Sequence, residues 1–268
     1  MIRMLEKMWA FVKRDFIEET SYRLAFVLQV FGLMLSVSAF FFVTKMIDPD
    51  TPGLDGIDPF PWMLLGISFQ YYFSTALYAF ASRIRDEQVL GTLEAMLVSP
   101  TPTSVVVFAS ATWDFLWGGL RVILYLVIAK LVFGIPLHFE GLGPLAVGIV
   151  LTLLSSAGIG ILSASFILYF KRGDPINMVI SGLTMFFGSV VFPVQQLPQV
   201  LQPISQFLPI TWSLKVVRGA LLKGLGFAEL SGELLRLAAL TVVLLPAGLY
   251  LARIAIRKAK QEGSLVKY

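Results

Sequence analysis

Long apolar segments alternate with short polar ones along the whole chain, and this alternation most limits what the chain can fold into. The first apolar segment, residues 22–46, would rise about 37 Å as a helix, which is enough to cross a bilayer with some tilt. A hydrophobic fraction of 57% with only 14% charged residues lies outside the range of soluble globular domains. The pattern predicts an all-α integral membrane protein with one transmembrane domain over residues 1–268.

Six segments have the length and apolarity of a transmembrane helix, at about 20 residues for each crossing. The predicted spans are residues 22–46, 61–81, 103–133, 144–170, 176–191 and 234–254. Residues 1–21 precede them and place apolar side chains broadly on one side and charged side chains on the other. This predicts a helix that lies flat in the membrane interface, with a solvated helix packed on a partner as the alternative.

The basic residues predict how the spans are oriented. They concentrate in four segments, which are residues 1–21, 82–104, 171–175 and 253–268. Residues 47–60 and 134–143 contain neither Lys nor Arg. Because basic segments stay on the cytoplasmic side, we expect a multi-pass protein of the cell (plasma or inner) membrane with both termini in the cytoplasm. The exceptions, which fall in a segment predicted to be external, are Lys215, Arg218 and Lys223.

Residues 192–232 fit neither a span nor an ordinary loop. Prolines recur through the first part and forbid one continuous helix, while glutamines lie between apolar residues. The prolines are Pro193, Pro198, Pro203 and Pro209. Irregular backbone at membrane depth needs protein or water to satisfy it. We therefore expect short re-entrant helices on the external side, followed by an amphipathic stretch through the three basic residues named above.

The third span carries charges at a depth where charges are costly. Asp114 and Arg121 are seven positions apart, so they share one face of a helix about two turns from each other. Charged residues inside a membrane face a bundle interior or a water-filled cavity, and they are by default a hypothesis of function. A structural pair between helices is the other interpretation, and the sequence leaves both open.

Residues 83–100 form a charged segment between the second and third spans, on the predicted cytoplasmic side. As a helix, this segment would present an apolar stripe of either Val89, Leu93 and Met96 or Leu90, Leu93 and Leu97, and Pro100 with Pro102 would end it. Such a helix can lie in the lipid interface or dock into a groove on a soluble partner. The acidic residues disfavour binding to anionic lipid, so the sequence favours a protein partner.

Residues 87–100, EQVLGTLEAMLVSP, resemble the pattern E-x-x-x-G-T-L-E-x-L-x-x-[ST]-P of ABC type-2 export permeases, a family of drug, lipid and polysaccharide exporters. The order of an interfacial helix, six spans and a proline-broken segment before the last span is also similar. The resemblance implies that residues 83–100 are a coupling helix that docks on a separate ATP-binding subunit. The docking residues would be Glu87, Gly91, Thr92, Glu94, Leu97 and Pro100, and Met96 stands where leucine is common.

The resemblance also implies the rest of the assembly. ATP and Mg²⁺ would bind to the partner subunit, so this chain would hold no cofactor or metal and would not be an enzyme. It contains no Gly-Lys dipeptide and hence no phosphate-binding loop. Six spans are half of a transporter in this family, which implies a homodimer or a heterodimer with a related permease, together with two ATPase subunits.

The cargo and its path are predicted only in outline. Many Met, Phe and Tyr residues favour a hydrophobic or amphipathic cargo, such as a drug, a lipid or a lipid-linked glycan, with a polysaccharide as the alternative. Candidates for lining the path are Phe69, Tyr72, Met185 and Phe186, for which helix packing or lipid contact is the competing interpretation. The four prolines of residues 192–232 are the candidates for an outer gate.

Other classes of function fit less well. An ion-gradient-driven transporter usually needs intramembrane carboxylates or an inverted repeat, and Asp114 is the one deep acid. An intramembrane enzyme needs a nucleophile with its base or a metal cluster, but the chain has no cysteine and one histidine, His138, in a loop. The net charge of +4 does not indicate a nucleic-acid partner, because most Lys and Arg lie at the ends of apolar segments.

Overall fold

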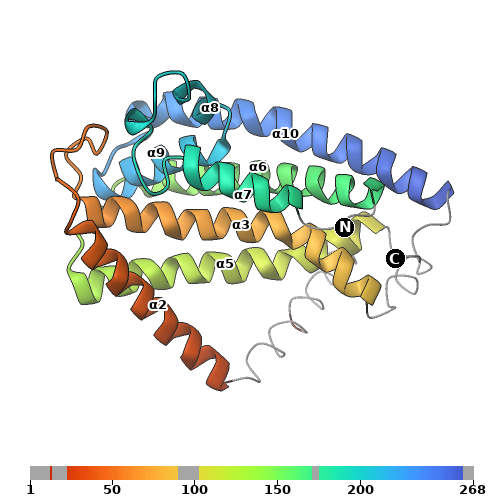
Figure 1. The fold of residues 1–268 in the computed structure, drawn as a ribbon, viewed down its shortest axis with the longest axis horizontal. Helices are drawn as coiled ribbons and strands as arrows, with labels where there is room; N and C mark the ends of the chain where they lie inside the picture. Colours follow the sequence, from red (N-terminus) through yellow and green to blue (C-terminus); the bar gives the residue numbers. More distant parts are fainter. Residues whose placement is uncertain (1–12, 14–22, 90–102, 171–174, 262–268) are drawn as a thin grey trace.

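The computed structural model describes residues 13, 23–89, 103–170 and 175–261, and every regular element among them is a helix (Figure 1). The elements are α2 (Arg23–Thr44), α3 (Pro59–Val89), α5 (Thr103–Phe133), α6 (Leu142–Phe170), α7 (Pro175–Phe187), the 3₁₀ helix η1 (Val194–Gln196), α8 (Gln202–Gln206), α9 (Pro209–Leu222) and α10 (Phe227–Gln261). The predicted all-α fold is confirmed for these residues.

Four helices in the described part of the chain are long and apolar enough to cross a membrane. Their apolar stretches are Val27–Thr44, Trp113–Phe133, Leu142–Phe166 and Phe227–Ala255. Each overlaps one of the predicted spans, and the helix α5 has the bounds of the third predicted span, 103–133. The chain is therefore a multi-pass membrane protein, while the total of six spans stays a prediction.

α7 is shorter than the fifth predicted span, 176–191, because the helix ends at Phe187. Ser189 has a positive φ of 62°, and this left-handed backbone conformation terminates a helix. With 13 residues, α7 rises about 20 Å, which is less than the roughly 30 Å of a bilayer hydrocarbon core. The predicted boundary at residue 191 is thus corrected to Phe187.

Two helices extend beyond their predicted boundaries. α3 continues from the second predicted span, 61–81, to Val89, so residues 83–89 prolong this helix instead of opening a separate coupling helix. α10 begins at Phe227, ahead of the predicted span 234–254 and inside the segment predicted to be external. The added stretches are rich in Arg, Glu, Gln, Leu and Ala, which are good helix formers, so their polarity does not stop either helix.

The long helices pack side by side, with α3 against both α5 and α6, and with α6 along α10 (Figure 1). Gly158 on α6 permits the close approach to α10, because a Cβ at this position would lie 2.8 Å from the backbone of Leu244. The largest cluster of buried apolar side chains lies chiefly between α3 and α9 and includes Phe69, Phe73 and Leu214. The core therefore contains a helix, α9, that is too short to cross a bilayer.

The connections gather at the two ends of the bundle (Figure 1). One end, which we call the outer end, carries residues 45–58, the start of α6, the helix α8 and the start of α10. The opposite, inner end carries Val89, Thr103 and Phe170, where the described helices meet the segments predicted to be cytoplasmic. The predicted external loops thus share one end, whereas the side of the membrane that each end faces stays a prediction.

Candidate functional site

The helix α9 is almost completely buried, and only Lys215 is fully exposed while Leu222 is half-buried. α9 lies against the outer half of α6, since Ser213 and Thr152 share a hydrogen bond of 2.5 Å between their hydroxyl oxygens. Near the other end of α9, the carbonyl oxygen of Leu221 accepts a hydrogen bond of 2.8 Å from the His138 N–H. The sequence predicted an amphipathic stretch here, and the structure adds that α3, α6 and α10 enclose the helix.

Arg218 holds α9 to two other segments at the outer end. Its side chain is 5% exposed, and its Nε and Nη2 donate hydrogen bonds of 3.1 and 3.0 Å to the carbonyl oxygen of Trp62 at the start of α3. Nη1 donates to the Ser189 hydroxyl (3.4 Å) and Nη2 to the Val190 carbonyl oxygen (3.4 Å), just after α7. The guanidinium also lies over the Trp62 ring, 3.4 Å from its centroid.

Burial of the Arg218 side chain affects the pKa and the stabilisation of its positive charge. Desolvation lowers the pKa of the Arg218 guanidinium from its ordinary value. In the described part of the chain no carboxylate forms an ion pair with it, so the carbonyl oxygens and the indole ring stabilise the charge. Gly66 on α3 makes room for this arrangement, because a Cβ there would lie 2.0 Å from the Val190 carbonyl oxygen. Arg218 therefore links α3, α9 and the turn after α7.

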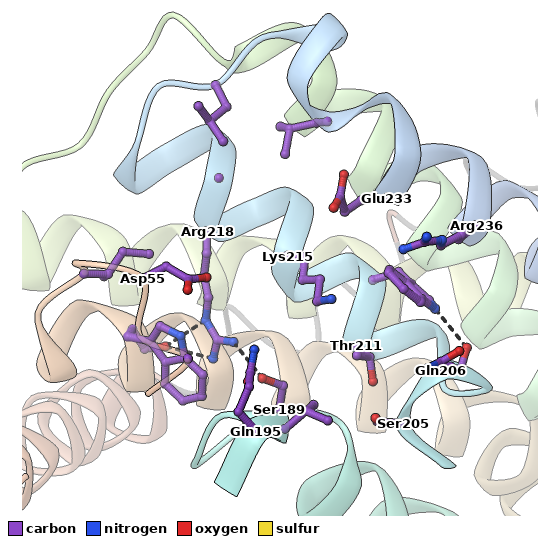
Figure 2. Close-up of a pocket in the computed structure, with 18 of the residues that line it drawn as sticks. Asp55, Ser189, Gln195, Ser205, Gln206, Thr211, Lys215, Arg218, Glu233 and Arg236 are labelled. Atoms are coloured by element: carbon purple, nitrogen blue, oxygen red, sulfur yellow. Dashed lines mark hydrogen bonds between the residues drawn. The ribbon is translucent and has the colours of Figure 1, made fainter. Parts of the chain in front are cut away.

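A cavity of about 770 Å³ opens at the outer end, between α10 on one side and η1, α8 and α9 on the other (Figure 2). Its wall includes the basic residues Lys215, Arg218, Lys223 and Arg236 and the acidic residues Asp55, Glu229 and Glu233. Ser189, Gln195, Gln202, Ser205, Gln206 and Thr211 add uncharged polar groups. A polar cavity with this many charges is unlike the apolar surface around most of the bundle.

Trp212 is the centre of the charged part of this cavity. The Nζ atom of Lys215 lies 4.6 Å from the centroid of the Trp212 ring, and Cζ of Arg236 lies 4.5 Å from it. The indole Nε1 donates a hydrogen bond of 2.9 Å to the Gln206 carbonyl oxygen. Beside it, the hydroxyl of Thr211 is buried and has no hydrogen-bond partner among the residues that the structure describes. Lys215 from α9 and Arg236 from α10 reach toward the same part of the cavity (Figure 2).

The four predicted gate prolines belong to the segment that supplies part of the cavity wall, although none of the four lines the cavity itself. Pro193 and Pro209 are buried, whereas Pro198 and Pro203 are exposed. Pro209 is the first residue of α9 and Pro203 lies in the first turn of α8, positions where a proline costs a helix nothing. The segment also contacts the loop before α3, because Gln196 Nε2 donates a hydrogen bond of 3.3 Å to the Pro52 carbonyl oxygen. The structure thus places the proline segment along one wall of the cavity.

The four candidates for lining a path do not come together. Phe69 and Tyr72 are buried in the core cluster, with their ring centroids 6.4 Å apart. Met185 and Phe186 are exposed on the surface of α7. Within a single copy of the chain, the first two therefore pack helices together, and the last two face outward.

The charged residues of the third span are both half-buried on α5. Arg121 donates hydrogen bonds to the Tyr71 hydroxyl on α3 and to Gln29 Oε1 on α2 (3.2 Å). Its guanidinium also lies 5.1 Å from the centroid of the Tyr71 ring. These contacts support the structural interpretation of Arg121 as a link between three helices, while Asp114 lies about two turns away on the same helix.

A row of polar side chains joins α7 to α3 and α6, and sequence reasoning missed it. Gln70 Nε2 donates a hydrogen bond of 3.0 Å to the Thr184 hydroxyl, and the hydroxyl oxygens of Ser74 and Ser181 lie 3.1 Å apart. Nearer the inner end, the Ser163 hydroxyl donates to the side chain of Asn177. The signal in the sequence was the helical spacing of Asn177, Ser181 and Thr184, which puts polar groups on one face of α7. We call these residues the polar row.

Sequence reasoning also missed Thr211, Trp212 and Arg236 in the cavity. Arg236 carried a usable signal, since a basic residue fell within the last predicted span near its external end. Trp212 carried no usable sequence signal, because a tryptophan near a predicted helix start is common in membrane proteins.

The predicted coupling segment is described only where it begins. Glu87 lies in the last turn of α3, whereas Gly91, Thr92, Glu94, Leu97 and Pro100 lie outside the described residues, as does the predicted interfacial helix except for Lys13. In the described part of the chain, no group of three or more His, Cys, Asp or Glu side chains could hold a metal ion.

Comparison with known families gives one result. Residues 6–222 match the family described as ABC-2 type transporter, a stretch that contains the predicted coupling segment, the proline segment and α9. No curated protein gave a significant match to the chain.

Proposed function

The chain belongs to the ABC-2 type transporter family, whose membrane domains are transport permeases and not catalytic subunits, and from this premise we propose that it is the transmembrane half of an ATP-driven exporter. Members of this family pair with an ABC ATP-binding subunit. In our proposal ATP and Mg²⁺ bind to that partner, and two permease chains, identical or related, assemble with two ATPase subunits. Both termini lie in the cytoplasm.

The observation that carries the proposal is that residues 87–100 fall within the matched family region and lie in sequence between the last turn of α3 and the start of α5. Val89 ends α3 and Thr103 begins α5, and both lie at the inner end of the bundle (Figure 1). The coupling motif therefore connects two helices that reach into the core of the permease. A partner that docks on the motif acts directly on both helices.

α3 can transmit a displacement at the inner end of the bundle to the outer end. Its 31 residues form one helix that rises about 46 Å, from Pro59 at the outer end to Val89 at the inner end. The first turns of α3 hold α9 through the hydrogen bonds between Trp62 and Arg218. In the proposed mechanism, ATP-driven closure of the partner subunits displaces the coupling motif, α3 moves as a rigid element, and α9 with the proline segment moves at the outer gate.

The cargo in this proposal is hydrophobic or amphipathic, such as a drug, a lipid or a lipid-linked glycan, with a polysaccharide as the alternative. The outer cavity supports an amphipathic cargo, since it combines charged groups with apolar side chains such as Leu230 and Leu240. Met185 and Phe186, exposed on α7, supply apolar surface that a second permease copy or the cargo can cover.

The proposal is tested by co-purification with the ATP-binding subunit. Glu94→Lys reverses a charge in the coupling motif and is expected to abolish the association, while the permease keeps its melting temperature and its elution volume in size-exclusion chromatography. Glu140→Lys makes the same charge change on an exposed residue at the outer end and is expected to leave the association intact. Transport by the purified permease alone on an ion gradient would contradict the proposal and support a secondary transporter.

A further inference from the structure

We propose that α7 is a movable helix that separates from α3 and α6 along the polar row and pivots at the turn around Ser189. The movement concerns the permease chain alone and is measured without the ATPase partner or the cargo, so its absence would leave the coupling proposal intact. One consequence does rest on the proposed function. The separated polar row then offers uncharged hydrogen-bonding groups to the polar part of an amphiphilic cargo.

The face of α7 that contacts the bundle is polar. Among residues 176–187, the only buried side chains are Asn177 and Thr184, each 0% exposed. The apolar side chains of this stretch are half-buried or exposed, and Ile180 is the one among them that packs against the largest core cluster. Close apolar packing, which holds helices together inside a membrane, therefore contributes little to the position of α7. The hydrogen bonds of the polar row carry this contact.

These hydrogen bonds leave two enclosed polar atoms without a partner. Gln70 Oε1 and Asn177 Nδ2 are buried, and neither has a hydrogen-bond partner among the described residues. The Ser181 carbonyl oxygen, 3.2 Å from Gln70 Nε2, fixes the orientation of the Gln70 amide, because only the NH₂ group can donate to it. Buried polar groups without a partner are costly. Because both atoms are enclosed, only a movement of the helices brings them into contact with water or with a ligand.

Gln70 is also placed among more acceptors than it can serve. Its Nε2 lies 3.0 Å from the Thr184 hydroxyl oxygen, 3.2 Å from the Ser181 carbonyl oxygen and 3.3 Å from the Ser74 hydroxyl oxygen. An amide nitrogen has only two N–H groups, so these contacts compete for them. The row therefore holds α7 to α3 less firmly than a fully paired network would.

The turn after α7 is held more firmly than α7 itself. Arg218 of α9 donates hydrogen bonds to the Ser189 hydroxyl and to the Val190 carbonyl oxygen. Gly66 lets this carbonyl oxygen pack directly on α3, since a Cβ at position 66 would lie 2.0 Å from it. The positive φ of Ser189 ends α7 just before this anchored turn. The outer end of α7 therefore stays in place, and the inner end, which carries Asn177, moves farthest.

The test measures distances by pulsed electron paramagnetic resonance on the full-length permease in nanodiscs, with an excess of unlabelled protein to suppress distances between copies. The cysteine-free chain receives Val150→Cys on α6 together with either Met178→Cys or Phe186→Cys on α7, and the cysteines are spin-labelled. These three side chains are 52, 74 and 56% exposed, so the labels leave the polar row intact. We expect a short and a long distance for the Met178 pair and one narrow distance for the Phe186 pair, which lies near the pivot. A single narrow distance for the Met178 pair, or equal broadening of both pairs, would overturn the proposal.

Asn177→Val distinguishes a movable α7 from a rigid polar link. Valine removes the unpaired amide, and the Ser163 hydroxyl can then donate to a carbonyl oxygen of its own helix, as the Ser165 hydroxyl donates to that of Ile161. We expect the population of the long distance in the Met178 pair to fall by at least about fivefold. A rigid link held by Asn177 predicts a looser α7, so an unchanged or broader distribution contradicts the proposal.

Ser165→Val is the matched control, because Ser165 is also buried on α6 but bonds within its own helix. It is expected to leave both distance distributions unchanged. A narrowing equal to that of Asn177→Val would show that the polar row does not govern the movement, and would count against the proposal. If Asn177→Val does not fold, the distances in the chain with an intact polar row decide the question.

Discussion

The guanidinium of Arg218 lies over the indole ring of Trp62 and donates two hydrogen bonds to the carbonyl oxygen of the same residue. The two residues are 156 positions apart in the chain. Their contact fixes α9 to the outer end of α3, and α3 continues from there to the inner end. A buried cation that has no carboxylate partner among the described residues thus holds a helix that does not itself cross the bundle.

Removing this cation is expected to destabilise the permease strongly. Arg218→Leu leaves the Trp62 and Val190 carbonyl oxygens without their donors, and we expect a loss of about 2–4 kcal/mol, measured as a lower melting temperature in detergent. Lys223→Leu is the control, because Lys223 is exposed at the end of the same helix and its loss should change stability by less than about 0.5 kcal/mol. Equal melting temperatures for the two variants would show that the hydrogen bonds of Arg218 contribute nothing to stability.

The contact between α6 and α10 is expected to tolerate no side chain at Gly158. A Cβ there would lie 2.8 Å from the backbone of Leu244, so Gly158→Ala forces the two helices apart and should cost about 1–3 kcal/mol. Gly182→Ala on α7 is the matched control, because nothing lies within 4 Å of a Cβ at that position, and alanine favours a helix over glycine. A melting temperature for Gly158→Ala at or above that of Gly182→Ala would contradict this packing.

The polar row predicts a disulfide between α3 and α7. The side-chain oxygens of Ser74 and Ser181 lie 3.1 Å apart, and the chain has no cysteine of its own. Ser74→Cys combined with Ser181→Cys is expected to cross-link on mild oxidation, detected by mass spectrometry of the digested protein. Ser74→Cys combined with Met178→Cys is the control that should not cross-link, since Met178 is 74% exposed on α7. The reverse pattern would mean that α7 faces α3 differently.

The orientation is tested by labelling cysteines from the two sides of the membrane. Asp50→Cys lies in the exposed loop at the outer end, and Arg257→Cys lies near the inner end of α10. We expect a membrane-impermeant maleimide to label the first in intact cells and the second only in inverted vesicles or permeabilised cells. Labelling of Asp50→Cys only from the cytoplasm would overturn the predicted orientation.

The sequence predicted both ends of α5 correctly, because the residues next to each end determine where the helix begins and ends. α5 begins directly after Pro102 and ends before Gly134, which has a positive φ of 67°, and its apolar run has the length of one crossing. Such boundaries depend on nearby residues only. The same local logic located the breaks at Pro203 and Pro209, each of which lies in the first turn of a short helix.

Burial of α9 could not be predicted in this way. Lys215 and Arg218 made the sequence of α9 resemble that of an amphipathic surface helix. The hydrogen-bond partners of Arg218 are Trp62, Ser189 and Val190, and no sequence pattern connects these residues to it. The buried position of Arg218 also explains one of the three exceptions in the count of basic residues. The positive-inside rule applies to basic residues in exposed loops, and Arg218 lies in the protein core.

The shortness of α7 has a consequence for the membrane around it. The helix rises about 20 Å, so it falls roughly 10 Å short of the thickness of a hydrocarbon core. At the outer end of α7 the chain turns at Ser189, which lines the polar cavity. In the predicted topology, where α7 is the fifth span, lipid beside α7 would have to thin, or water would have to enter the bilayer plane from the cavity. The apolar barrier to a polar group that moves outward along α7 would then be narrower at this point than in the surrounding bilayer.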